Sequence, residues 1–142
     1  MIKGNTTTAF KFVKFRVSNF SFDEPEKEND GYDIKFSPKG KYNENEGSYE
    51  LTVNFKAYDK QNSKKLIINV NSVSHFKFEK PCKFDQLPSH FFTNSIPIIF
   101  PYLRAFVSTL TLQANSRILM LGLINFTNMA EPLKENTEII NN

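Results

Sequence analysis

Residues 49–57 narrow the choice of fold more than any other segment, because apolar and polar side chains alternate along them without a break. The apolar members are Tyr49, Leu51, Val53, Phe55 and Ala57. The polar members are Glu50, Thr52, Asn54 and Lys56. A period of two predicts a β-strand with one buried and one solvated face, as in antiparallel sheets. The rest of the chain must therefore supply partner strands and a second layer.

Two further segments are predicted to be strands of the same sheet. Leu66–Phe78 follows a polar turn at 59–65 and begins with alternating, β-branched residues, which predicts a hairpin with the preceding strand. Residues 32–42 form a weaker candidate, because Pro38 cannot donate a ladder hydrogen bond and Gly40 brings no side chain to the packing.

A fourth strand is predicted at residues 9–23, where the alternation changes phase twice. The residues that share a face are, in turn, Phe10 with Phe12, Phe15 with Val17, and Phe20 with Phe22. One extra residue in a strand moves every later side chain to the opposite face. Two phase changes therefore predict two β-bulges, or a strand that bends between two partners. Residues 23–30 are charged and contain Pro25, which predicts a loop.

The second half of the chain changes to helical patterning. Residues 79–95 contain two prolines and are predicted to form an irregular crossing. A helix is predicted to begin between residues 96 and 101 and to end near residue 113, because its apolar residues recur at helical spacing. Pro97 and Pro101 are expected to lie in its first turn, where a missing N–H donor costs little.

A second, short helix is predicted from residue 125 to about residue 135, followed by a polar tail that is expected to be frayed. Strands followed by helices are typical of the α+β class. The predicted architecture is a four-stranded antiparallel sheet with two C-terminal helices packed on one face. We expect one domain over 1–142, with an ordered core at about 9–134 and polar termini at 1–8 and 135–142.

The sequence contains no catalytic or metal-binding motif that we can identify. It has one cysteine, Cys82, and two histidines, His75 and His90, and its five glycines are not clustered. This argues against nucleophilic catalysis, a metal site and a phosphate-binding loop. We therefore expect a protein that is not an enzyme and that needs neither a metal nor a cofactor.

Charge and hydropathy indicate where the protein works. The net charge is +3, from 18 basic and 15 acidic residues, and the lysines are scattered, so no nucleic acid is expected as a partner. The N-terminus lacks a signal-like apolar segment. The longest apolar stretch, 118–126, is too short to span a bilayer, so no membrane insertion is expected. One cysteine suits a reducing compartment, and we expect a cytoplasmic protein.

The chain has fifteen phenylalanines and no tryptophan. This surplus of large apolar side chains indicates self-association, an apolar groove, or both, although a Phe-rich core is an equal alternative. Phe84, Phe91 and Phe92 lie in the predicted crossing beside the amphipathic helix. They predict either a groove for apolar segments or a set of anchors that fix the crossing to the sheet.

Three segments of the chain carry a resemblance to a known family. Residues 98–104, Ile-Ile-Phe-Pro-Tyr-Leu-Arg, resemble the I-L-F-P-Y-A-R that opens the first helix of the SecB family of export chaperones. Residues 119–126 resemble the family's L-N-L-A-P-V-N-F, and residues 20–25 resemble its I-S-F-E-x-P at the end of strand one. The resemblance extends from about residue 10 to about residue 133.

The resemblance implies an ATP-independent holdase that binds unfolded preproteins in apolar grooves, forms a homotetramer as a dimer of dimers, and passes clients to SecA. The implied groove residues are Phe76, Phe78, Phe84, Phe91, Phe92, Leu119, Leu121, Phe126 and Met129. The predicted oligomer interface, on the outward side of the Leu66–Phe78 strand and on the first helix, consists of Ile68, Val70, Ser72, Tyr102 and Phe106. Core packing is the competing interpretation for each of these residues.

The chain also departs from the family. SecB proteins are usually strongly acidic, and the positions that match their SecA-facing surface are Asn19, Asp23, Ile67 and Asn69, of which only Asp23 is charged. Charge complementarity guides docking, so SecA stays an open question as a partner. Two alternatives follow: a chaperone dedicated to one partner, such as an antitoxin, and a binding module that is not a chaperone.

Overall fold

The computed structural model describes most of the chain, namely residues 9–25, 31–61, 65–114, 119, 121–122 and 124–141. Parts of four predicted features lie outside the described residues: the polar N-terminus, the charged loop, the hairpin turn and the helix break, at 1–8, 26–30, 62–64 and 115–118.

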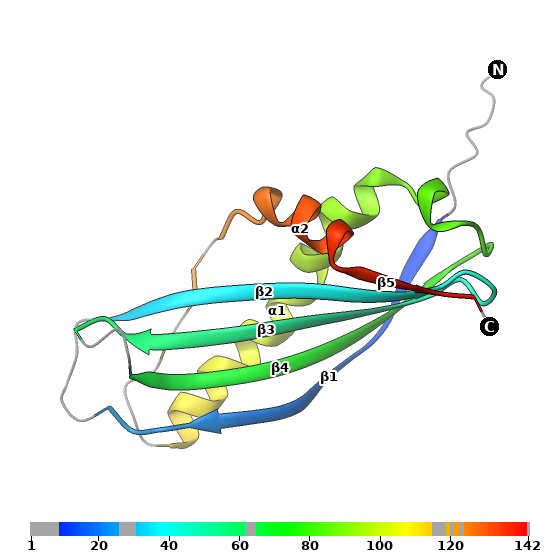
Figure 1. The fold of residues 1–142 in the computed structure, drawn as a ribbon. Helices are drawn as coiled ribbons and strands as arrows, with labels where there is room; N and C mark the ends of the chain where they lie inside the picture. The colour runs from blue at the N-terminus through cyan, green and yellow to red at the C-terminus, as the bar shows by residue number, and fades with distance from the viewer. Residues whose placement is uncertain are drawn as a thin grey trace.

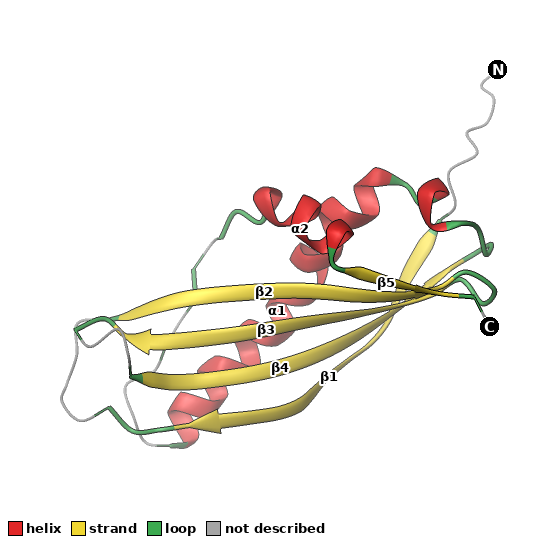
Figure 2. Cartoon of the chain, in the orientation of Figure 1, coloured by secondary structure: helices red, strands yellow, loops and turns green. Residues whose placement is uncertain are grey.

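The described residues form one mixed sheet and two α-helices (Figures 1 and 2). The strands are β1 (Phe10–Phe22), β2 (Tyr32–Asn43), β3 (Ser48–Asp59), β4 (Leu66–Phe78) and β5 (Thr137–Ile140). The helices are α1 (Ser89–Gln113) and α2 (Ala130–Glu135), each preceded by a 3₁₀ turn, η1 (Phe84–Gln86) or η2 (Thr127–Met129). The strand order is β1-β4-β3-β2-β5. Helix α1 crosses behind the sheet in Figure 1, so the opposite face stays uncovered.

Strand β1 contains the two bulges that its sequence predicts. Its register with β4 shifts between Phe12 and Lys14 and again between Val17 and Asn19. Each shift reverses the alternation, so six of the seven apolar residues of β1, all except the bulge residue Val13, pair with residues on the buried side of β4. The bulges therefore keep one apolar face turned toward α1 along the whole strand.

Residues 137–140 of the C-terminal tail form a strand, so the prediction of a frayed end is wrong for them. The prediction of four antiparallel strands is wrong as well, because this strand is a fifth. Strand β5 pairs in parallel with β2, which makes the sheet five-stranded and mixed. Two hydrogen bonds fix Thr137, the first residue of β5. The Tyr49 hydroxyl lies 2.7 Å from Thr137 Oγ1, and Thr137 Oγ1 donates to the Leu133 carbonyl oxygen at 2.8 Å. The strand is only four residues long, too short to be recognised from its alternation, and its partner β2 lies far away in the chain.

Helix α1 begins at Ser89, well before the predicted start. Pro97 and Pro101 lie inside it rather than in its first turn. Both prolines are exposed, and their spacing of four places them on one side of the helix. Water can therefore solvate the carbonyl groups that lose a donor there. The opposite side buries Phe91, Phe92, Ser95, Ile96, Ile99, Phe100, Leu103, Val107 and Thr111, and this packing outweighs the local preference of proline.

Helix α1 is also long and apolar enough to span a membrane, with a mean hydropathy of 1.4 in its best window. The longest apolar stretch of the sequence, 118–126, lies outside this helix. Nine side chains of α1 are buried inside the molecule, so its apolar composition is accounted for by packing against the sheet.

The close approach of Gly40 in β2 to the Tyr49 side chain in β3 can be tested by substitution. A Cβ atom added at Gly40 would lie 1.9 Å from the Tyr49 hydroxyl oxygen, which also contacts Thr137. We expect Gly40→Ala to lower the free energy of unfolding by about 2–4 kcal/mol, through overpacking and loss of this hydrogen bond. Urea denaturation measures the change. Gly122→Ala is the control, because an added Cβ meets nothing within 4 Å. Equal unfolding midpoints for the two variants would contradict the expectation.

Candidate binding surfaces

The nine predicted groove residues fall into two groups. Six are interior, with exposed fractions of 6% or less: Phe76, Phe78, Phe91, Phe92, Leu121 and Phe126. Phe84, Leu119 and Met129 are half-buried. These three present apolar surface to solvent, while the other six form the layer beneath.

Phe91 is the centre of the interior group. It lies on α1 and not on a crossing, and its ring faces five aromatic neighbours, mostly edge-on. The centroid separations are 4.9 Å to Phe10, 4.6 Å to Tyr49, 5.3 Å to Phe76, 4.9 Å to Phe78 and 5.3 Å to Phe92. Phe91 therefore fixes the start of α1 to the sheet, which is the anchoring alternative left open by the sequence.

A second aromatic cluster connects the segment before α2 to the sheet. The ring of Phe126 lies 5.2 Å from Phe36 and 5.0 Å from Phe100. Phe36 and Phe10 were missing from the predicted groove set. Their parity in β2 and β1 is the sequence signal for their inward orientation, but it does not show which helix they meet.

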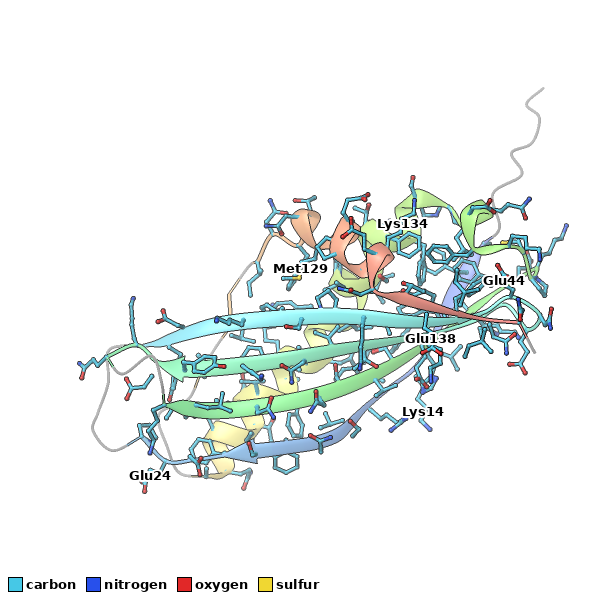
Figure 3. The ribbon with its side chains drawn as sticks, viewed as in Figure 1. Lys14, Glu24, Glu44, Met129, Lys134 and Glu138 are labelled. Carbon is cyan, nitrogen blue, oxygen red and sulfur yellow. The ribbon has the colours of Figure 1, made fainter. Side chains whose placement is uncertain are left out.

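The crossing before α1 is held by a buried phenol. The Tyr42 hydroxyl donates to the Cys82 carbonyl oxygen at 2.7 Å and accepts from the Cys82 N–H at 3.3 Å. Burial raises the pKa of Tyr42 to about 12, so the group is protonated and able to donate at neutral pH. The Phe84 N–H donates to Glu44 Oε2 at 2.9 Å. Phe84 is therefore held at the surface by a fixed backbone (Figure 3 labels Glu44).

Large apolar side chains are exposed on β1 and on α1. Val13 and Phe20 of β1, and Tyr102 and Leu112 of α1, are each about half exposed. The Tyr102 ring lies 5.2 Å from Phe12, and the Phe20 ring lies 5.2 Å from Phe106, which joins the two elements into one surface. We call the set Phe20, Tyr102 and Phe106 the β1–α1 strip. Strand β1 ends the sheet, so its outer edge adjoins this strip.

The structure corrects part of the predicted oligomer interface. Ile68, Val70 and Ser72 are fully buried, because their register with β1 turns them toward the helix side of the sheet. The prediction that they form an outward surface is therefore wrong. Tyr102 and Phe106 lie on the β1–α1 strip, where their role in assembly stays a prediction.

Of the four residues predicted to face SecA, three reach the surface and one is buried. Asn19 and Asp23 are exposed, and Asn69 is half-buried on the uncovered face of the sheet. Ile67 is 1% exposed, and its carbonyl oxygen accepts from the Asp23 N–H at 2.8 Å. A register irregularity between β3 and β4 falls at Ile67. The prediction that Ile67 faces a partner is therefore wrong.

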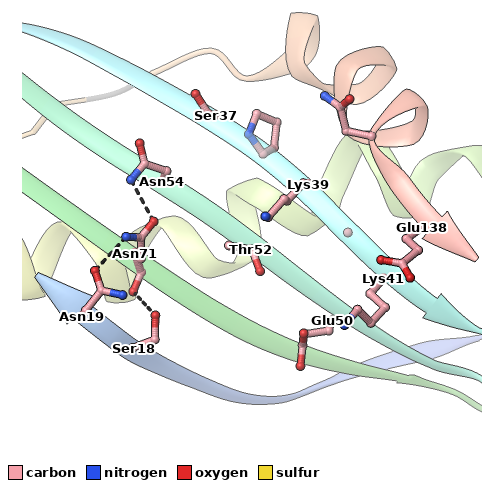
Figure 4. Close-up of a pocket in the computed structure, with 13 residues that line it drawn as sticks. Ser18, Asn19, Ser37, Lys39, Lys41, Glu50, Thr52, Asn54, Asn71 and Glu138 are labelled. Atoms are coloured by element: carbon pink, nitrogen blue, oxygen red, sulfur yellow. Dashed lines mark hydrogen bonds between the residues drawn. The ribbon is translucent and has the colours of Figure 1, made fainter.

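The uncovered face of the sheet contains a hollow of about 790 Å³ with a polar lining, which extends from β1 to β5 (Figure 4). Asn19, Asn54 and Asn71 line it beside Thr52 and Glu50, and Asn69 is the hydrogen-bonded neighbour of Asn54. Asn54 Nδ2 donates to Asn69 Oδ1 and Asn71 Oδ1, and Asn71 Nδ2 donates to Asn19 Oδ1, each at 2.8 Å. This site was not predicted, since the asparagines meet only after four strands are set in register.

Sequence comparison decides the family. The family model for SecB, preprotein translocase subunit SecB, matches residues 4–136. The chain belongs to the SecB family. The resemblance found in the sequence is thereby confirmed, and with it the prediction that this SecB-family protein is a molecular chaperone.

Two similar proteins extend the comparison. Uncharacterized protein MJ0357 of Methanocaldococcus jannaschii is 30% identical over 141 residues, which cover 92% of this chain and 90% of that protein. The solved structure of the Mycobacterium tuberculosis Rv1957 SecB-like chaperone, in complex with a ChAD peptide from the Rv1956 HigA1 antitoxin, superposes with a TM-score of 0.68 at 16% identity. It covers 82% of this chain and 88% of that chain, so this SecB-family protein shares the fold.

Proposed function

We propose that this SecB-family protein is an ATP-independent holdase, which binds unfolded segments of other proteins and does no chemistry on them. The match of the SecB family model to residues 4–136 carries the proposal. The work of such a chaperone is to cover apolar segments, and for that it needs apolar surface of its own in contact with water. A cytoplasmic location and the absence of a cofactor are part of the same proposal.

We place client binding on the side of α1 that adjoins η1 and η2. Phe84 and Met129 are half-buried there, and interior aromatic residues support them from below. Met129 has a flexible side chain that adapts to varied partners. Lys134 Nζ lies 6.0 Å from the centre of the Phe92 ring, so the surface has a charged border (Figure 3). The arrangement suits apolar segments of varied sequence better than one fixed shape.

This placement can be tested by substituting the two half-buried residues, Phe84 and Met129. We expect Phe84→Asp combined with Met129→Asp to reduce suppression of aggregation about tenfold, because each carboxylate would lose water against the client. Light scattering from chemically reduced insulin, without ATP, measures the effect. Asn94→Asp combined with Gln113→Asp adds the same charge at exposed positions of α1 and should leave suppression unchanged. A wild-type protein that fails to suppress aggregation at a stoichiometric ratio would rule the holdase out.

A second candidate is a chaperone dedicated to one partner. The solved complex of a SecB-like chaperone with an antitoxin peptide favours it, as does the loss of charge at Asn19 and Asn69, which the family uses to meet SecA. A dedicated chaperone would bind the product of a neighbouring gene tightly and protect unrelated clients weakly. A general holdase would protect insulin and other unfolded clients alike.

We also propose that the protein associates with itself through the β1–α1 strip, as a dimer or a dimer of dimers. The open edge of β1 supplies backbone hydrogen-bonding groups, and the strip supplies apolar side chains beside them. Stable interfaces between subunits combine an apolar centre with hydrogen bonds, and the strip and the β1 edge together supply both.

A further inference from the structure

The uncovered face of the sheet carries far more positive charge than the chain as a whole. We call the outward side of β1, β4, β3 and β2, with Glu138 of β5, the open face. Strand register assigns eight basic and three acidic residues to it, which gives a net charge of +5. The whole chain carries +3, so all other residues together sum to −2.

These charges are arranged in two rows. Lys11, Lys14 and Arg16 follow β1 on one side of the open face, and Lys35, Lys39 and Lys41 follow β2 on the other. The order β1-β4-β3-β2 separates the rows by three strand spacings, or about 14 Å. All six side chains are exposed.

The central strands place Lys56, Lys77 and Glu50 between the two rows, and the stretch of floor around Asn54 is uncharged and peptide-like. Asn54, Asn69 and Asn71 of the central strands present carboxamides, which are hydrogen-bonded to one another at 2.8 Å. A carboxamide carries both a donor and an acceptor, as a peptide group does. The hollow of about 790 Å³ above this floor is lined by Lys39 and Lys41 and by Glu50 and Glu138, and it has the size of a site for a short segment of chain. The basic residues of β1 lie outside this lining, so the excess of positive charge belongs to the open face as a whole.

We propose that the open face is a docking surface for an acidic, extended polypeptide segment. The segment lies along the asparagine floor, its peptide groups meet the carboxamides, and its carboxylates reach the lysines on both sides. Strand side chains alternate outward to two sides, which matches the two basic rows. An acidic sheet face recruits a basic partner, whereas this basic face recruits an acidic one.

A nucleic acid fits the open face less well. Proteins that hold single strands stack bases on aromatic side chains. The described strands place two aromatic rings on this face, Tyr58 and His75, and they lie far apart along it. Lys35 Nζ is 5.5 Å from the ring centre of Tyr58. The asparagines at the centre of the floor are small and polar, so they offer no platform for a run of stacked bases.

The test uses a labelled synthetic peptide of alternating glutamate and glycine, with fluorescence anisotropy as the readout. We expect Arg16→Glu combined with Lys39→Glu to weaken binding at least about tenfold, since one charge is reversed in each row. Lys80→Glu combined with Lys83→Glu, in the crossing before α1, makes the same change in net charge away from the open face. This control should stay within about twofold of wild type.

Three outcomes would overturn the proposal: no salt-sensitive binding of the acidic peptide, equal weakening by both pairs of substitutions, or tighter binding of a DNA duplex than of the peptide. The open face lies on the opposite side of the sheet from α1. Suppression of insulin aggregation by Arg16→Glu with Lys39→Glu should therefore match wild type, and it also shows that the variant is folded. If the protein failed to suppress insulin aggregation, the proposal that the open face binds acidic peptides would still stand. If it failed to bind the acidic peptide, the proposed holdase function would still stand.

Discussion

Replacing Phe91 with alanine should lower the free energy of unfolding by about 3–5 kcal/mol, the range for removal of a buried phenylalanine ring. Phe91 is fully buried, and its ring contacts residues from β1, β3, β4 and α1. Alanine would leave a cavity that these elements cannot close, because each belongs to a different part of the framework. Such a loss is a large fraction of the stability of a domain this size.

The same substitution at Phe84 is the matched control. Phe84 is half-buried and has ring contacts with Tyr42 and Phe92 only at 6.4 Å and 5.8 Å. Phe84→Ala should therefore cost about 1 kcal/mol. Urea denaturation followed by circular dichroism compares the two variants. If Phe84→Ala destabilised the protein as much as Phe91→Ala, the division into an interior layer and a surface group would be wrong.

Local patterns predicted the sheet well where a strand's own alternation decides its structure. The unbroken alternation at residues 49–57 gave the central strand and its buried face, and the phase changes after Phe12 and Val17 gave two bulges. Each of these features depends on residues adjacent in the chain. The C-terminal strand depends instead on an edge of β2, nearly a hundred residues earlier in the sequence, and no local pattern reports that contact.

Helix α1 shows how packing overrides a local rule. Pro97 and Pro101 argue for a start close to them, yet the helix begins at Ser89. The energy of burying Phe91 and Phe92 exceeds the cost of two missing donors on the solvent side. The length of the buried surface, and not the position of the prolines, sets the start of the helix.

The binding surfaces were predicted less well, because they depend on how strands are paired. The even-numbered residues of β4 are apolar except for Ser72 and Ser74, but Ile67 and Val73 are apolar as well, so the sequence did not show which side faces the core. Register with β1 and β3 decides it, and Ile68 and Val70 prove to be interior. The basic rows of the open face are hidden for the same reason, since their lysines come from strands far apart in the chain.

The β1–α1 strip leads to the other large expected effect. With the self-association proposed above, Phe20→Asp combined with Tyr102→Asp should convert the assembly to monomers of 16.4 kDa. Both side chains are about half exposed in the single chain, so the substitutions add no buried charge to the monomer. In an assembled interface each aspartate would be taken out of water without a partner, which costs several kcal/mol per group. A loss of that size exceeds a thousandfold in the association constant.

Native mass spectrometry and sedimentation at the same protein concentration measure the change. Ile139→Asp is the control, because Ile139 is equally exposed but lies on β5, at the other end of the sheet from β1. Wild type and Ile139→Asp should both sediment as multiples of the chain mass, and the strip variant as a single chain. A wild-type protein that is monomeric at micromolar concentration, or an Ile139→Asp variant that also dissociates, would show that assembly does not use this strip. Monomers produced by the strip substitutions should still unfold cooperatively, since the interior layer around Phe91 is complete within one chain.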